Sequence, residues 1–164
     1  MTSPGRVAQR PVTDADEPFL RRLYASTREA ELEQMPFDEE QKLQFLCFQY
    51  DAQHAHYTSA HPDASFQLVL VDGEPAGRLY VASSDERIHL IDIALLPTFR
   101  GHGVGEQLLR GLIGEADVRG RSVTAHVERH NRALRLYRHL GFEIAEEGDV
   151  YLLMRWSAPA PAGS

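Results

Sequence analysis

Apolar residues recur along the chain with two different periods, and the period changes after about residue 60. In the first part the spacing is helical, and it predicts a helix up to about residue 30 and another from about residue 39 to about residue 56. Residues that favour helix N-termini precede both, at 13–16 and at Asp38, and a short strand is expected over residues 7–12. The inner face of the second helix is predicted to comprise Leu43, Leu46, Cys47 and Tyr50.

From residue 66 the pattern changes to short apolar runs separated by turn residues. Strands are predicted over residues 66–71, 75–82 and 88–96, with Asp72-Gly73 as a hairpin turn between the first two. Helices are predicted from Val104 and over 131–140, with a strand over 121–127 between them and a hairpin over 142–154 after them. The order β-αα-βββ-α-β-α-ββ joins its late strands through helices. It therefore predicts a mixed α/β fold with at least one parallel strand pair.

Composition narrows the class of protein. The chain has 164 residues, 43% of them hydrophobic, and is expected to form one domain over residues 1–156 with a disordered, Pro-rich tail over 157–164. The net charge of −7 argues against a general nucleic-acid binder, which would carry a basic patch. Neither a membrane-spanning apolar run nor a signal peptide is recognisable. The single cysteine, Cys47, cannot form a disulfide framework, so a cytoplasmic location is expected.

The most distinctive local feature is a glycine-rich turn between an apolar strand and the helix that begins at Val104. A helix N-terminus has unpaired N–H groups and positive potential, and glycines let an anion approach the backbone, so a phosphate or pyrophosphate is the expected ligand. The spacing fits neither a dinucleotide-binding G-x-G-x-x-G motif nor a P-loop, because Glu106 and Gln107 follow the last glycine. The alternative to an anion site is a glycine-rich turn that binds no ligand. The turn consists of Arg100, Gly101, His102, Gly103, Val104 and Gly105.

Two motifs in this order resemble the GNAT superfamily of N-acetyltransferases. The first is Arg100-x-x-Gly103-x-Gly105 after an apolar strand. The second lies about 30 residues later and runs from Asn131 through the Leu-Tyr pair ending at Tyr137 to a closing Gly-Phe. The resemblance covers roughly residues 5–156, which is nearly the whole part of the chain that is expected to fold.

The resemblance implies transfer of an acetyl group from acetyl-coenzyme A to a primary amine, by direct attack in a ternary complex. The backbone amides of residues 100–105 would hold the pyrophosphate of the coenzyme. The Leu95 N–H would bind the thioester carbonyl as a one-donor oxyanion site. Asn131 would contact the coenzyme arm, and the Tyr137 hydroxyl would lie near the sulfur, where it could protonate the leaving thiolate.

The base that takes a proton from the attacking amine is left open by the resemblance. Asp92 lies in an apolar strand, where a carboxylate is costly unless it is paired or functional. His126 lies on the next predicted strand, and imidazole suits proton transfer near neutral pH. The alternatives are a structural carboxylate for Asp92 and a packed or surface histidine for His126.

Other residues with reactive or binding side chains are given simpler explanations. No metal site is expected at His54, His56 and His61, because no acidic ligand pattern accompanies them. Cys47 is expected to be a small core residue and not a nucleophile. In the family the end of the first helix often borders the acceptor site, so Arg28, Glu29 and Glu31 could contact the substrate, although a solvated charged face is the favoured interpretation. Four aromatic residues could line that site or belong to the core: Phe45, Phe48, Tyr57 and Tyr80.

Three functions can therefore be compared. The favoured one is an acetyl-coenzyme A-dependent N-acetyltransferase, for which Tyr137 and a usable base are needed. The alternative is a regulatory module of the same fold that binds coenzyme A or its acyl form and catalyses nothing. A domain that acts on nucleotides is disfavoured by the failed motif spacings. The sequence does not identify the acceptor amine, and a homodimer is compatible with the family.

Overall fold

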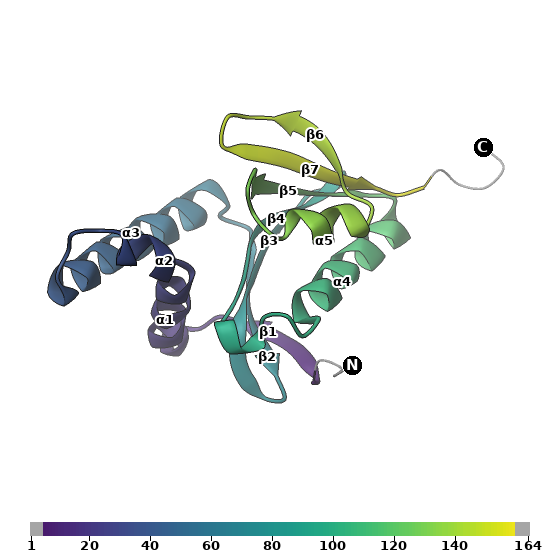
Figure 1. Ribbon diagram of the computed structural model, residues 1–164. Coiled ribbons are helices and arrows are strands. Elements are labelled where there is room, and N and C mark those ends of the chain that lie inside the picture. Colours follow the sequence, from purple (N-terminus) through teal and green to yellow (C-terminus); the bar gives the residue numbers. More distant parts are fainter. Residues whose placement is uncertain (1–4, 160–164) are drawn as a thin grey trace. The chain divides into compact units, whose positions relative to one another are not determined.

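The computed structural model describes residues 5–159, and its strands and helices follow the predicted order (Figure 1). These residues fall into two compact units. The first comprises the chain up to Tyr80 together with Asp92–His102, and the second comprises Val81–Ile91 and the chain from Gly103 onward. Strands β3 (Glu74–Ser83) and β4 (Arg87–Leu95) contribute residues to both units.

The first unit contains strands in the order β1-β2-β3-β4. β1 (Val7–Pro11) and β2 (Ser65–Val71) are antiparallel, with Val7 opposite Val71. Asp72 and Gly73 join β2 to β3, and their φ angles of 52° and 84° are those of a two-residue hairpin turn with both residues left-handed. The hairpin predicted at Asp72-Gly73 is therefore confirmed.

Three helices of the first unit follow β1: α1 (Glu17–Thr27), α2 (Glu29–Glu33) and α3 (Glu39–Ala60). The first predicted helix is thus divided in two at Arg28, whose φ of −112° and ψ of 2° depart from helical values. The apolar face of α1 packs against α3 and β2. This core consists of Phe19, Leu20, Leu23, Tyr24, Tyr50 and Leu68.

The prediction that Leu43, Leu46, Cys47 and Tyr50 form the inner face of α3 is wrong for residues near the N-terminus of the helix. Leu43 is 62% exposed and Cys47 is exposed, whereas Leu46 is partly buried and Tyr50 is buried. The reason is one of length: the 22 residues of α3 span about 33 Å and the 11 residues of α1 only about 16 Å. The first turns of α3 therefore extend beyond the end of α1 (Figure 1). An amphipathic pattern predicts a buried face only where a neighbour exists to cover it.

The second unit continues the strand order as β4-β5-β7-β6. β4 and β5 (Ser122–Glu128) are parallel, from Arg87 opposite Ser122 to Leu90 opposite Ala125, so the predicted parallel pair is confirmed. β7 (Tyr151–Ser157) lies antiparallel between β5 and the edge strand β6 (Glu143–Glu147). β7 ends at Ser157, and the part of the predicted tail from residue 160 onward lies outside the described residues.

Two helices complete the second unit. α4 (Val104–Arg119) packs against β5 through a buried stripe that includes Leu108 and Leu112. α5 (Leu134–His139) is followed by Gly141, whose φ of 101° is the left-handed conformation that ends a helix, as predicted. Among residues 5–159, no helix is both long and apolar enough to cross a membrane.

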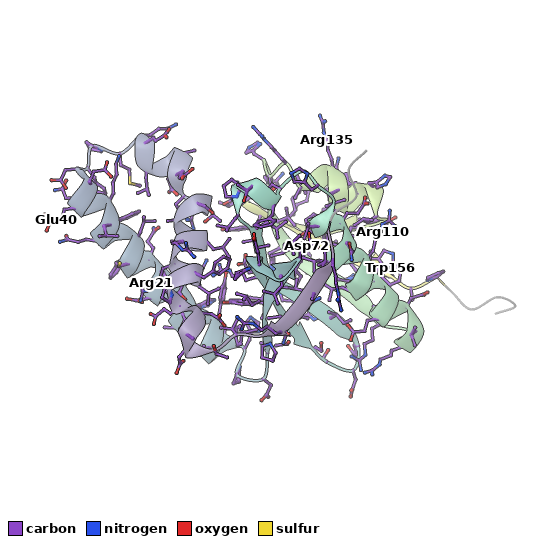
Figure 2. All side chains as sticks on the ribbon, turned by 90° about the horizontal axis from the view of Figure 1, so that it is seen from below. Arg21, Glu40, Asp72, Arg110, Arg135 and Trp156 are labelled. Carbon is purple, nitrogen blue, oxygen red and sulfur yellow. The ribbon has the colours of Figure 1, made fainter. Side chains whose placement is uncertain are left out.

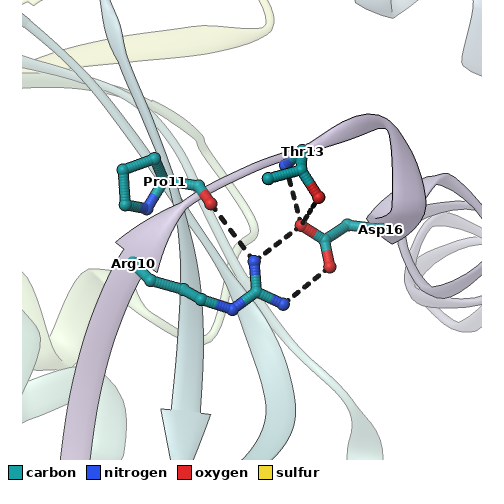
Figure 3. Close-up of polar contacts among 4 residues, drawn as sticks. All are labelled: Arg10, Pro11, Thr13 and Asp16. Carbon is teal, nitrogen blue, oxygen red and sulfur yellow. Dashed lines mark hydrogen bonds and ion pairs between the residues drawn. The ribbon is translucent and has the colours of Figure 1, made fainter.

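A bidentate ion pair joins the end of β1 to the start of α1 (Figure 3). The two terminal nitrogens of Arg10 donate to the two carboxylate oxygens of Asp16 at 2.8 and 2.7 Å, and the Thr13 N–H donates to one of them at 2.8 Å. The Arg10 guanidinium, aided by the Thr13 N–H, holds the pKa of Asp16 well below its usual range. Asp16 therefore stabilises the fold in its ionised form.

We expect Asp16→Asn to lower the free energy of unfolding by roughly 1 kcal/mol near neutral pH, as the loss of a helix-capping group does. Because the pKa of Asp16 is lower in the folded protein, its contribution is present above about pH 4 and is lost as the pH falls below that value. Urea unfolding at pH 7 and pH 3 should therefore show a difference from wild type that shrinks at pH 3. Asp14→Asn, in the same turn, is the control. An equal loss at both pH values would contradict the assignment.

Candidate active site

The glycine turn leads into an uncapped start of α4. Gly101 and Gly103 have φ angles of 77° and 86°, which favour glycine at both positions. Gly103 is the residue before the helix, and its carbonyl accepts the N–H of Gln107 at 3.0 Å as the first helical hydrogen bond. The N–H groups of residues 104–106 consequently have no acceptor within the helix. Together with the helix dipole, they form a site suited to an anion.

Gly105 is a glycine that the fold itself does not require. It is not among the residues with positive φ, and a Cβ added there would meet no described atom within 4 Å. An alanine would be the better helix former by about 1 kcal/mol. Gly111 and Gly114 of α4 share these properties, but only Gly105 lies in the first turn beside the free ends of the N–H groups, where the close approach of a ligand would explain it.

Arg100 ties the turn back to the end of β4. Its Nε donates to the carbonyl oxygen of Leu95 at 2.9 Å. The next N–H, that of Leu96, donates to Ala76 of β3 at 2.8 Å. Because successive N–H groups of a strand point to opposite sides, the Leu95 N–H points away from β3.

β3 and β4 approach each other closely just before Leu95. A Cβ at Gly77 would overlap the carbonyl oxygen of Ala94 and would lie 2.8 Å from a methyl group of Leu95. Only glycine leaves room for this contact. Gly77 therefore fixes the path of the last residues of β4.

Asp92 is paired with a buried arginine that the sequence analysis did not single out. Arg78 of β3 is 4% exposed, and its Nε donates to the Asp92 carboxylate at 2.5 Å. Its Nη2 donates to Gln53 of α3 at 2.9 Å. Asp92 itself is 24% exposed, so it is both held in place and open to solvent on one side. A single carboxylate in an apolar strand indicated that Asp92 needs a partner, but nothing in the sequence identified that partner as Arg78.

Two of the predicted aromatic candidates surround this ion pair. The guanidinium carbon of Arg78 lies 5.0 Å from the ring centroid of Tyr80 and 6.0 Å from that of Tyr57. Burial raises the pKa of both tyrosines, against the opposing effect of Arg78, so both hydroxyls stay protonated. By contrast, Phe48 is exposed and Phe45 packs against Phe37. Tyr57 and Tyr80 are therefore the aromatic residues that accompany Asp92.

The second proposed base, His126, is exposed on β5. Its ring centroid lies 5.4 Å from that of His89 on β4, in an edge-to-face arrangement. Nδ1 of His89 is 2.8 Å from the hydroxyl oxygen of the buried Thr124. His89 was not predicted as part of a site, because its strand gave no period that set it apart.

The two candidates from the second motif lie on either side of the start of α5. Asn131 is exposed, and its side-chain oxygen accepts the N–H of Ala133 at 2.8 Å, so it shapes the turn before the helix. Tyr137 is buried, and its ring packs edge-to-face on Phe142 at 5.2 Å between centroids. Both residues thus have a local structural role in addition to any role in a site.

The candidate residues are divided between the two units. The first unit holds Asp92, Leu95, Arg100, Gly101 and His102; the second holds Gly103, Val104, Gly105, His126, Asn131 and Tyr137.

The remaining candidates have local contacts. Arg28 forms an ion pair with Glu31 at 3.2 Å, which agrees with a solvated charged face at this end of the helix. His54 stacks on Tyr50. In the described part of the chain, no group of three or more His, Cys, Asp or Glu side chains could hold a metal ion.

A sequence profile described as the acetyltransferase (GNAT) family matches residues 21–142. Two curated relatives are mycothiol acetyltransferases. The one from Thermobifida fusca (strain YX) is 38% identical over 98 residues, and the one from Nocardiopsis dassonvillei is 34% identical over 108 residues. These alignments cover 58% and 65% of this chain but 26% and 28% of the relatives. The chain thus spans about a quarter of the length of the curated relatives it matches.

Solved structures with the same fold include three acetyltransferases. PaiA N-acetyltransferase from Thermoplasma acidophilum, in complex with coenzyme A, has a TM-score of 0.68 at 16% identity and covers 93% of this chain and 99% of its own. An acetyltransferase from Thermus thermophilus has a TM-score of 0.66 at 22% identity, covering 96% and 99%. Arabidopsis thaliana Naa50, with a bisubstrate analogue, has a TM-score of 0.60 at 17% identity, covering 92% and 98%. The predicted fold class is therefore confirmed.

We expect Gly77→Ala to destabilise the protein by about 1–3 kcal/mol, because the added methyl group has no room beside Ala94. Thermal or urea unfolding measures the effect. Gly111→Ala is the matched control, since the same methyl group on α4 meets no described atom and should leave stability unchanged or raise it. If the two variants were equally stable, β3 and β4 could move apart at Gly77 without loss of stability, which would contradict the prediction.

Proposed function

The chain belongs to the acetyltransferase (GNAT) family, whose profile matches well over half of it, and on this basis we propose an acetyl-coenzyme A-dependent N-acetyltransferase that acts on a primary amine. Family membership and the curated relatives make it an acyltransferase enzyme, which favours catalysis over a non-catalytic binding module. The single observation that carries the choice of cosubstrate is the start of α4, where the first N–H groups have no acceptor within the helix and Gly105 leaves the backbone open. We expect the reaction to take place in the cytoplasm.

The pyrophosphate of the coenzyme would bind at the glycine turn. The N–H groups of residues 104–106 would donate to it, and the absence of a Cβ at Gly105 would let it approach the backbone. Arg100 would add terminal guanidinium donors, because its hydrogen bond to Leu95 uses only Nε. Two structures of the same fold support this cosubstrate, since they are complexes with coenzyme A and with a bisubstrate analogue of it.

Acetyl-coenzyme A supplies an activated acyl group as a thioester. The Leu95 N–H, which points away from β3, would donate to the thioester carbonyl oxygen and stabilise the negative charge that develops on it. Arg100 binds the carbonyl of the same residue, which in an extended strand points to the same side as the N–H, and this bond helps to fix the conformation of Leu95. Asn131 would contact the coenzyme arm from the turn before α5.

Asp92 is the base that we propose. An amine is protonated near neutral pH and must lose a proton before its nitrogen can attack. Arg78 binds one carboxylate oxygen of Asp92, and the other oxygen would take that proton directly or through one water. His126, exposed on β5 beside His89, is the second candidate for the same step.

Tyr137 is the acid that we propose. As the amine nitrogen bonds to the acetyl carbon, the carbon–sulfur bond breaks and the thiolate needs a proton. The hydroxyl of Tyr137 would supply it and would recover a proton from solvent afterwards. Packing of the ring on Phe142 would hold the hydroxyl in one position.

The acceptor is proposed only as a class, a small primary amine. The curated relatives are named for mycothiol, so a mycothiol-related amine belongs in any acceptor screen. The screen should also contain amino acids, polyamines, aminoglycosides and peptide N-termini. Release of the coenzyme thiol, followed with a thiol reagent, identifies the acceptor.

We expect Gly105→Ala to leave folding intact and to weaken acetyl-coenzyme A binding about tenfold or more, because the methyl group would occupy space that only the ligand needs. Unfolding and calorimetry with acetyl-coenzyme A measure the two effects separately. Gly111→Ala, on the same helix, should not lower stability and should not weaken acetyl-coenzyme A binding. Unchanged affinity in Gly105→Ala would remove the main support for the proposed coenzyme site.

We expect Tyr137→Phe to lower the chemical rate by about a hundredfold, the usual scale of general acid catalysis, with little change in coenzyme affinity. Single-turnover kinetics and calorimetry distinguish the two quantities. Wild type that binds acetyl-coenzyme A but releases no thiol with any amine would favour the non-catalytic module. A wild-type rate in Tyr137→Phe would reduce Tyr137 to a packing residue.

A further inference from the structure

Arg78 and Asp92 contact each other through one nitrogen and one oxygen. Nε of Arg78 donates to Oδ2 of Asp92 at 2.5 Å, whereas Nη2 donates to Oε1 of Gln53 on α3 at 2.9 Å. In the described part of the chain, Nη2 makes no hydrogen bond to Asp92. The second carboxylate oxygen of Asp92 is therefore not bound by the arginine.

A guanidinium can also bind a carboxylate at two points. Its planar fork of N–H groups matches the spacing of the two carboxylate oxygens. The same unit contains such a pair, in which the terminal nitrogens of Arg10 bind both oxygens of Asp16 at 2.8 and 2.7 Å. There the arginine holds the pKa of Asp16 well below its usual range. A carboxylate bound at both oxygens is thus a weaker base, and the one-point contact of Arg78 avoids this.

The groups around Arg78 leave its Nη2 few other partners. Arg78 is 4% exposed, so bulk water cannot replace a lost acceptor. The other titratable groups that interact with it are three tyrosines, and burial raises the pKa of each, so all three stay neutral. They are Tyr50, Tyr57 and Tyr80. Among the described residues, Asp92 is the one carboxylate paired with Arg78. Without its amide acceptor on α3, Nη2 would therefore turn to the second oxygen of Asp92.

We propose that Gln53 is a positioning residue: by holding Nη2 of Arg78, it keeps the arginine on one oxygen of Asp92 and leaves the other oxygen free to take the proton of the amine. This inference rests on the proposed function, because it takes Asp92 as the base. In that step the N–H bond of the amine breaks and an O–H bond forms at the free oxygen. Gln53 and Arg78 exchange no proton. They act through the geometry of the carboxylate.

Contacts other than those of Gln53 hold α3 in place. Nη2 of Arg21, on α1, donates to Asp51 of α3 at 2.7 Å (Figure 2). The hydroxyl of Tyr24, also on α1, donates to Oε1 of Gln49 at 3.1 Å. Removal of the Gln53 amide should therefore leave α3 where it is and change only the partners of Arg78.

The test follows the titration of Asp92 by nuclear magnetic resonance of its carboxyl carbon, in the whole chain without acetyl-coenzyme A. The signal is assigned by its absence from Asp92→Asn. In Gln53→Met, Asp92 should lose its proton at a lower pH than in wild type, because the carboxylate gains a second bond from Arg78. Gln49→Met is the matched control, since it removes an amide acceptor from the same helix but leaves Arg78 untouched. A wild-type titration in Gln53→Met, or an equal change in both variants, would overturn the proposal.

Gln53→Glu tests the same idea by rescue. Its carboxylate keeps an acceptor opposite Nη2 of Arg78, so the change to lower pH should be absent. The same change in Gln53→Glu as in Gln53→Met would contradict positioning through Nη2. Far-ultraviolet circular dichroism shows whether each variant is folded. A crystal structure of the wild type near neutral pH needs no variant, and a two-point contact between Arg78 and Asp92 there would also overturn the proposal.

Failure of this inference can be distinguished from failure of the proposed function. If Asp92→Asn releases the coenzyme thiol as fast as wild type in the amine screen, Asp92 is not the base, whatever its titration shows. If Asp92→Asn loses thiol release while Gln53→Met titrates as wild type does, the base stands and the role of Gln53 is overturned.

Discussion

The buried guanidinium of Arg78 is the constraint around which the first unit is organised. A charge removed from water destabilises a fold unless acceptors are placed against it, and breaking such a pair leaves the charge uncompensated. Here the acceptors come from two other elements, Asp92 of β4 and Gln53 of α3. The rings of Tyr57 and Tyr80 provide further stabilisation through their faces. One side chain of β3 thus holds a helix and a neighbouring strand in fixed positions and orients the carboxylate that we propose as the base.

A second set of constraints controls the end of β4. Gly77 allows β3 to lie against Ala94, the Leu96 N–H bonds to Ala76, and Arg100 bonds to the carbonyl of Leu95. The chain then needs only a few residues to reach α4, and two left-handed glycines make the change of direction. The proposed oxyanion donor is therefore positioned by backbone contacts within the first unit and by the Arg100 side chain.

Features that depend on local sequence were predictable. The hairpin at Asp72-Gly73, the glycine end of α5 at Gly141 and the order of strands and helices all follow from neighbouring residues, and all agree with the structure. Features that depend on contacts between residues far apart along the chain could not be predicted from the sequence. The ion pair between Arg78 and Asp92 requires knowing which residues of β3 and β4 face each other, and the exposure of Leu43 requires knowing where α1 stops. The sequence marked Asp92 as unusual in its strand, but its partner became visible only with the fold.

The exposed position of Cys47 has a practical consequence. It is the single cysteine of the chain, and it lies on α3, the helix that also carries Tyr50 and Gln53. A thiol-reactive fluorophore or spin label would therefore attach at one known position, without any cysteine having to be removed first. Because α3 contributes Gln53 to the hydrogen bonds of Arg78, such a label would report on movement of this helix when a substrate binds beside Asp92.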